Sequence, residues 1–174
     1  MAGQYGETRG HGERVAVRVL GPTGGDTLGA VTAVRDRFLI DGHVSGAGFS
    51  LVEHLMPPRA LAAPLHRHSR EDEYSFVLEG QVGALFDGEE VVGRVGDLIF
   101  KPRGEWHTFW NAGDVPARIL EIISPGGFER AFREMHALGE ALDPTTMAAI
   151  AGRYGVDVDF GQTGAIIERH RLTF

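Results

Sequence analysis

The sequence contains no cysteine among its 174 residues. Disulfide bridges, thiolate metal ligands and a cysteine nucleophile are therefore excluded, and the redox compartment stays open. The sequence also lacks any apolar run close to the roughly 20 residues that a membrane helix needs. Its first residues show no basic stretch followed by an apolar one, the pattern of a signal peptide. We therefore expect a cytoplasmic protein with no membrane partner.

Clusters of lysine and arginine are missing as well. The formal net charge is -7, from 17 basic and 24 acidic residues whose signs are mixed along the chain. A nucleic-acid surface would need a basic patch, so we expect no nucleic-acid partner and a small-molecule partner instead. The 25 glycines follow no repeat period, which is typical of the many tight turns of an all-β domain.

Two histidines stand two positions apart in PLHRHSREDEYSFVLEG, residues 64–80. On an extended strand, His66 and His68 leave the same face of the sheet. The polar segment SREDE predicts a turn after them, and YSFVL then resumes as an apolar strand. Glu71 and Glu73 have the same parity, so strand register alone permits either carboxylate to face the histidines.

A second block, GDLIFKPRGEWHTFWN at residues 96–111, follows the same plan. A glycine and a short apolar strand lead to a Pro-x-Gly corner, after which His107 opens an aromatic strand. Three neutral imidazoles and a carboxylate suit Fe(II), Mn(II), Ni(II), Co(II), Cu(II) or Zn(II), and suit Ca or Mg poorly. A lone strand histidine is more often only a satisfied polar residue, so the joint pattern carries the interpretation. We read the two blocks as one transition-metal site per chain.

The two blocks resemble the paired motifs of the cupin superfamily. The first block reads His66-x-His68, four residues, Glu73, six residues and Gly80, and lacks only the glycine that precedes the histidines in the family. The second block matches the family motif at Gly96, Pro102, Gly104, His107 and Asn111.

This resemblance implies an all-β fold, an antiparallel double-sheet jelly-roll barrel. It also implies that the metal ligands are His66, His68, Glu73 and His107. The family spacing selects Glu73 over Glu71. Because cupin barrels commonly pair, the resemblance further implies a homodimer.

The remaining patterns divide the chain into three parts. Residues 1–14 hold one aromatic residue and no aliphatic residue larger than Ala or Met, so we expect a mobile arm. Residues 15–124 carry the strand patterns of the cupin barrel, beginning with a strand over 15–20. Asp87-Gly88, between two of these patterns, predicts a two-residue hairpin turn.

Residues 125–174 predict a helical extension and a tail. Apolar residues from Phe128 to Leu142 recur at three- and four-residue spacing, which predicts one amphipathic helix packed on the barrel. Asp143-Pro144 predicts the start of a second helix that ends at Gly155. The tail after it contains VDVDF and AII, which suit either edge strands or an arm over a neighbouring subunit.

Phe109 and Val77 are our candidate pocket residues. Phe109 shares the parity of His107, so it points into the barrel if His107 does.

Three further polar residues have weaker expectations. In strand 47–56 either face is able to line the barrel, so Glu53 or His54 is a candidate second layer around the ligands. A position at the rim or in solvent is the better expectation for each of these two residues. His136 falls on the polar side of the first predicted helix, and we expect it to be exposed.

The short gap between the motifs and the segment SPGGFERAFREM, residues 124–135, resemble small bacterial quercetinase-like proteins, relatives of quercetin 2,3-dioxygenase. This second resemblance implies a metal-dependent dioxygenase that opens a flavonol or another enolic substrate, with Glu73 as general base. Two alternatives stay open. One is a metal-dependent isomerase, epimerase or lyase of a sugar or keto acid, and the other is a non-enzymatic small-molecule-binding cupin.

Overall fold

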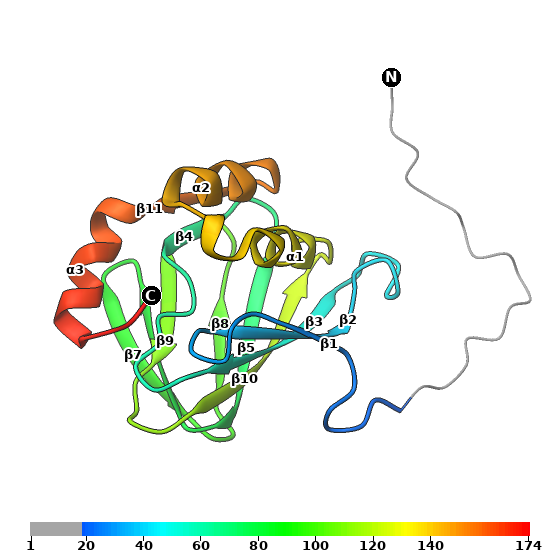
Figure 1. Ribbon diagram of the computed structural model, residues 1–174, viewed down its shortest axis with the longest axis horizontal. Helices are drawn as coiled ribbons and strands as arrows, with labels where there is room; N and C mark the ends of the chain where they lie inside the picture. The colour runs from blue at the N-terminus through cyan, green and yellow to red at the C-terminus, as the bar shows by residue number, and fades with distance from the viewer. Residues whose placement is uncertain (1–18) are drawn as a thin grey trace, which may run out of the picture.

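A computed structural model of the protein describes residues 19–174. The predicted arm, residues 1–14, and most of the predicted strand 15–20 lie outside these residues. The described chain folds into two antiparallel sheets, followed by three α-helices (Figure 1). Within this part of the chain, no helix is long and apolar enough to cross a membrane.

The first sheet has six strands in the order β1-β2-β3-β10-β5-β8. Its strands are β1 (Asp26–Leu28), β2 (Arg35–Ile40), β3 (Ser50–Met56), β5 (Asp72–Glu79), β8 (Leu98–Lys101) and β10 (Ala117–Ser124). Every second residue of β10 is buried, as expected of a strand with one face on the core.

The second sheet has five strands in the order β11-β4-β9-β6-β7. Its strands are β4 (Leu65–His68), β6 (Gln81–Phe86), β7 (Glu89–Arg94), β9 (His107–Asn111) and β11 (Val156–Asp159). The predicted hairpin joins β6 to β7, and both residues of its turn, Asp87 and Gly88, have positive φ. This confirms the two-residue turn.

The core lies between the two sheets. One buried cluster combines Met56, Val77, Ile99, Ala117 and Ile119 from the first sheet with Val82, Ala84 and Phe109 from the second. Two sheets that close on a shared apolar core form the jelly roll that the motifs predicted.

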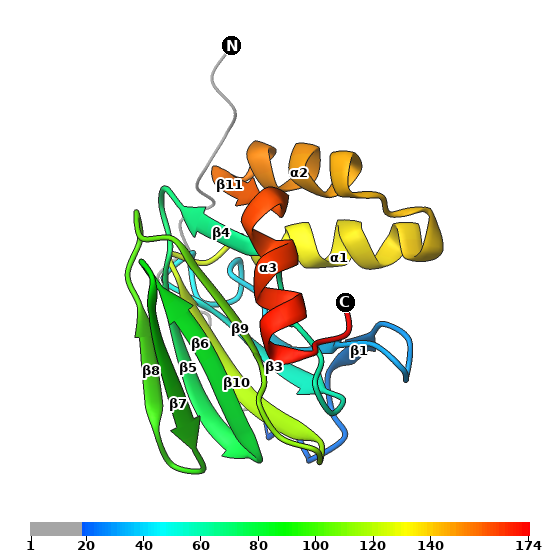
Figure 2. The ribbon, with the colours of Figure 1, turned by 90° about the vertical axis from the view of Figure 1, so that its left-hand side faces the viewer.

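The helices are α1 (Glu129–Leu138), α2 (Pro144–Arg153) and α3 (Phe160–His170), with a short 3-10 turn at Gly139–Ala141. The two predicted helices are present. The N-cap of α2 is confirmed, because Oδ1 of Asp143 accepts a hydrogen bond from the Thr146 N–H at 2.7 Å. Helices α1 and α2 lie side by side at one end of the sheets (Figure 2).

The third helix was not predicted, and it corrects the expectation of two C-terminal helices. The tail segment AII lies inside α3. Asp159 caps this helix by accepting a hydrogen bond from Gln162 N–H at 2.9 Å, and Ile166 is buried with Trp110 and Leu172. The VDVD segment forms the edge strand β11, which pairs with β4, the strand that carries His66 and His68.

Candidate metal centre and substrate cavity

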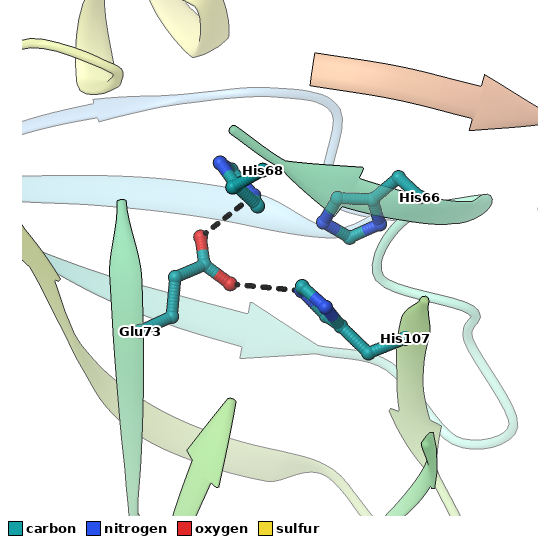
Figure 3. A group of neighbouring side chains, drawn as sticks. All are labelled: His66, His68, Glu73 and His107. Atoms are coloured by element: carbon teal, nitrogen blue, oxygen red, sulfur yellow. Dashed lines mark hydrogen bonds and ion pairs between the residues drawn. The ribbon is translucent and has the colours of Figure 1, made fainter. Parts of the chain in front are cut away.

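The four residues predicted as ligands converge between the two sheets (Figure 3). His66 and His68 come from β4, Glu73 from β5 and His107 from the start of β9. Cross-strand pairing places His66 opposite His107. One potential ligand atom from each residue lies within 4.8 Å of those of the others, and all four residues are buried.

The hydrogen bonds of the three imidazoles leave one nitrogen of each ring for a metal. Nδ1 of His66 lies 2.7 Å from the Pro64 carbonyl oxygen, and Nδ1 of His107 lies 3.0 Å from that of Glu105. A carbonyl oxygen only accepts, so both rings donate from Nδ1, and Nε2 is the nitrogen left to face a metal. Nε2 of His107 lies 3.3 Å from Oε2 of Glu73, within the cluster. A hydrogen bond from the second nitrogen is typical of metal-binding histidines.

Glu71 accepts the corresponding hydrogen bond from the ring of His68. Its Oε2 accepts a hydrogen bond from Nδ1 of His68 at 3.2 Å, and its side chain is buried. Of the two carboxylates that register left open, the structure therefore places Glu73 in the cluster and Glu71 behind His68.

The donor set fits a transition metal. Nε2 of His68 is completely buried and has no hydrogen-bond partner among the described residues, although Oε1 of Glu73 lies 3.3 Å away. An unpaired buried ring nitrogen is costly unless something binds it. Three imidazole nitrogens and a carboxylate form a typical cupin metal site and a borderline donor set for divalent transition metals.

A buried lysine, Lys101, contacts the cluster through Glu73. Nζ of Lys101 lies 2.9 Å from Oε2 of Glu73 and 2.9 Å from Oε1 of Glu121. It also lies 4.1 Å from the centre of the Phe109 ring. Oε2 of Glu121 accepts a hydrogen bond from the Ser75 hydroxyl at 2.6 Å. The ammonium group thus neutralises charge that would otherwise be buried without a partner.

These contacts shift the pKa values of the cluster. Burial raises the pKa of Glu73, but the Lys101 ammonium and the neighbouring imidazoles outweigh it and hold that pKa well below its usual value. Burial, followed by the charges of His107 and His68, holds the pKa of His66 well below its usual value. Glu73 is therefore a carboxylate and His66 a neutral imidazole at neutral pH, as metal binding requires.

A large cavity opens beside the cluster. Its volume is about 920 Å³, and His66 and Glu73 form part of its wall. Most of the remaining lining is apolar and comes from both sheets and from helices α1 and α2, with Phe109, Phe128, Phe132 and Met135 among the larger side chains. The volume lies at the upper end of the range for small-molecule sites.

The two candidate pocket residues lie in different places. Phe109 lines the cavity. Val77 does not, because it is completely buried in the same hydrophobic cluster as Phe109.

Glu53, His54 and His136 are all buried or partly buried. This corrects the expectation that Glu53 and His54 lie at the rim or in solvent and that His136 is exposed. Glu53 is buried and forms ion pairs with Arg37 and Arg118. His54 is buried and lines the cavity, and its ring nitrogen Nδ1 lies 2.6 Å from Asp36. His136 is only partly exposed, because it turns toward the same carboxylate.

Sequence reasoning missed Lys101, Glu121 and Asp36. Two of them had a signal in strand parity. Lys101 lies on the same face of β8 as the buried Ile99, and Asp36 lies on the same face of β2 as the buried Phe38. A charged residue in phase with buried apolar neighbours predicts a buried partner.

Comparison with known proteins agrees with this geometry. A family model described as a cupin domain matches residues 52–123. The chain is 32% identical over 89 residues to the tetracenomycin polyketide synthase protein TcmJ of Streptomyces glaucescens, an alignment that covers 51% of this chain and 60% of that protein. The chain thus spans less than two thirds of that relative's length.

Two solved structures have the same fold. A predicted oxalate decarboxylase from Thermotoga maritima is 25% identical, with a TM-score of 0.50 over 53% of this chain and 80% of that one. KdgF from a Halomonas species is 17% identical, with a TM-score of 0.53 over 60% and 90% of the two chains. At that lower identity, the likeness to KdgF shows the fold alone. Residues 52–123 therefore match a cupin domain, and the described chain has a jelly-roll fold like that of these structures.

Proposed function

We propose that the protein is a metal-dependent dioxygenase that acts on a flavonol-like or other enolic small molecule. The observation that carries this proposal is the position of the ligand cluster. His66 and Glu73 lie in the wall of a large, mostly apolar cavity. The proposed ligands are His66, His68, Glu73 and His107, holding one divalent transition metal per chain.

The charges of the cluster favour an anionic oxygen in the substrate. One carboxylate and three neutral imidazoles around a divalent ion leave a net positive site. When bound, the metal supplies a positive charge that stabilises negative charge on a substrate oxygen.

Glu73 is the proposed general base. Its pKa is held low by Lys101 and the imidazoles, so the carboxylate is ionised, and proton transfer to it requires a substrate hydroxyl whose own pKa is lowered by a bound metal. The O–H bond of the substrate breaks, its proton moves to the carboxylate, and the electron pair stays on the oxygen as an enolate. The apolar walls of the cavity exclude water from the reacting centre.

The relative in Streptomyces supports an enolic substrate. Its name assigns it to a polyketide synthase, and polyketide chains are rich in carbonyl groups that enolise.

Oxygen uptake tests the proposal. Protein loaded separately with Fe(II), Mn(II), Co(II) or Ni(II) is mixed with flavonols and other enolic compounds, and dissolved oxygen is followed with an electrode. We expect uptake that depends on the metal and is lost in Glu73→Ala. The matched control is Glu89→Ala, which removes an exposed carboxylate outside both the cluster and the cavity wall.

A second candidate, a metal-dependent isomerase, epimerase or lyase, is favoured by one observation. The similar structure from Thermotoga maritima is described as a predicted oxalate decarboxylase, and decarboxylases are lyases. Conversion of a sugar or keto acid without oxygen uptake, by protein that holds one metal per chain, would select this candidate. A protein that binds ligands with neither uptake nor conversion would be the non-enzymatic alternative.

We also propose a homodimer. Phe76, Leu98 and Phe100 expose apolar side chains on the neighbouring strands β5 and β8, and contiguous apolar surface is typical of protein interfaces. Sedimentation analysis of the protein and of Leu98→Glu tests this proposal.

A further inference from the structure

The cavity contains a second group of ionisable side chains, separate from the ligand cluster. Nδ1 of His54 on β3 donates a hydrogen bond to Oδ1 of Asp36 on β2, at 2.6 Å. Nε2 of His136 on α1 donates to Oδ2 of the same carboxylate, at 2.8 Å. All three residues line the cavity, and we call them the distal triad.

His54 is held so that one ring nitrogen faces the cavity. Its ring packs against Phe109, with centroids 5.6 Å apart, and against Phe132, at 5.7 Å. Nδ1 is occupied by Asp36, and no hydrogen bond to Nε2 is seen among the described residues. A histidine that is oriented by a carboxylate and has a free Nε2 is equipped to exchange a proton with a ligand.

The distal triad and the ligand cluster occupy different levels of the first sheet. Ser50 and Glu73 both pair with Ile123 of β10, so they stand at the same level of the first sheet. His54 follows Ser50 by four residues along β3, which places it about 13 Å further along the strand at about 3.3 Å per residue. Both groups belong to the wall of one cavity whose other lining side chains are mostly apolar. The buried pair of Lys101 and Glu121, which contacts Glu73, also acts on the charge of His54.

We propose that the distal triad is a second polar subsite, which binds an acidic hydroxyl group at the far end of an extended, multi-ring substrate. This deepens the proposed function, on which it rests for the identity of the cavity as the substrate site. A substrate with one enolic oxygen at the ligand cluster and a second phenolic or enolic hydroxyl at His54 would satisfy both polar ends of the cavity. A two-carbon or three-carbon acid is too short to reach both.

The proton exchange at this subsite is simple. The O–H bond of the substrate breaks and its electron pair stays on oxygen. The proton passes to the solvent where His54 is already an imidazolium, and forms a new N–H bond at Nε2 of His54 where the ring is neutral. Asp36 then faces an imidazolium through Nδ1–H, and the phenolate faces the same imidazolium through Nε2–H. The two negative groups flank one positive group, a favourable arrangement in a site with little water.

The ionisation of a bound phenol tests the proposal without turnover. The probe is 7-hydroxycoumarin, whose excitation spectrum separates phenol from phenolate, at a pH where the free probe is almost wholly the phenol. The full chain is titrated after treatment with a chelator and again after loading with Zn(II), which has no redox chemistry. 7-Methoxycoumarin, which has no proton to give, is the matched ligand.

We expect wild-type protein to bind 7-hydroxycoumarin as the phenolate, with or without Zn(II). His54→Gln should remove the phenolate band and weaken binding about tenfold, the usual effect of losing a charge-assisted hydrogen bond. Asp36→Asn, a second and nearly isosteric variant, should reduce the same band. His43→Gln, which alters an exposed histidine, should change nothing, and binding of 7-methoxycoumarin should be equal in all four proteins.

Three results would overturn the proposal: no binding of the probe to wild-type protein, binding only as the neutral phenol, or a phenolate band that persists in both His54→Gln and Asp36→Asn. A band that appears only with Zn(II) and survives these substitutions would assign the ionisation to the ligand cluster. Oxygen uptake is measured separately, so uptake without the band would remove the distal triad and keep the dioxygenase. The phenolate band without oxygen uptake would keep the distal triad and remove the dioxygenase.

Discussion

Lys101 and Glu73 form an ion pair between the two sheets, with Nζ of the lysine 2.9 Å from Oε2 of the carboxylate and both side chains almost fully buried. The proposed base is therefore tied to a fixed positive charge from the neighbouring strand β8. The pair orients the carboxylate and keeps it ionised, while Glu121 balances the remaining charge of the lysine.

We expect Lys101→Met to lower the free energy of unfolding strongly. The variant leaves Glu73 and Glu121 buried without their counter-charge, and breaking a buried ion pair in this way costs about 3–5 kcal/mol. Urea denaturation of the metal-free protein measures the free energy of unfolding.

The matched control is Arg103→Met, which breaks the exposed ion pair with Asp72 and should change the stability little. Adding Glu121→Gln to Lys101→Met should recover part of the loss. Equal stabilities for Lys101→Met and the wild type would contradict the role given to the lysine.

Asp36→Asn should destabilise the protein within a defined pH window. Burial raises the pKa of Asp36, but His54 and His136 outweigh it and lower that pKa below its usual 3.8. Its contribution is therefore present above about pH 4 and is lost as the pH falls further. Burial lowers the pKa of His54, but Asp36 outweighs it and raises that pKa above its usual 6.5, so this contribution is lost as the pH rises through the raised value.

The difference in unfolding free energy between wild type and Asp36→Asn should thus be largest between about pH 4 and pH 6.5, at about 2 kcal/mol. The other charged groups that act on His54 are Glu121 from β10 and Lys101 from β8, and neither is altered by the variant. Urea denaturation across the pH range measures the difference. A difference that stays constant from acid to alkaline pH would show that the carboxylate acts only through its shape.

The cluster of three histidines and a glutamate was predictable from local spacing, and the jelly roll from the resemblance of the two motifs to the cupin superfamily. Two histidines at alternate positions of a strand must share a face, whatever the rest of the fold does. The hairpin at Asp87-Gly88 and the cap at Asp143 likewise follow from backbone preferences of a few residues.

The distal triad was not predictable in the same way. The parity of β3 left open which face turns inward, and only pairing with β2 brings Asp36 beside His54. His136 reaches that carboxylate because α1 packs across this end of the sheets, a contact between residues 100 positions apart. Helix α3 was missed for another reason: its two glycines, Gly161 and Gly164, disfavour a helix, and burial of Ile166 outweighs them.

Metal affinity should fall as the pH drops below about 6, because protonated imidazoles stop being ligands. Burial lowers the pKa of His66 below the usual imidazole value, so this ring stays available in mildly acidic solution. We expect Zn(II) affinity to decrease at least about tenfold between pH 7 and pH 5, as measured by competition with a chromophoric chelator. An affinity that is flat across this range would contradict the assignment of three histidine ligands.

Glu71→Ala should weaken metal binding without removing a ligand. Glu71 holds the proton on Nδ1 of His68, and loss of such a partner typically costs 10–100-fold in metal affinity, so we expect a decrease of about tenfold. Glu73→Ala should cost more, because it removes a proposed ligand and leaves Lys101 facing the imidazoles. Glu89→Ala removes an equal charge from an exposed position outside the cluster and should leave the affinity unchanged. If Glu71→Ala proved more damaging than Glu73→Ala, the two carboxylates would have to exchange roles, and the base proposed for the substrate hydroxyl would have to be reassigned with them.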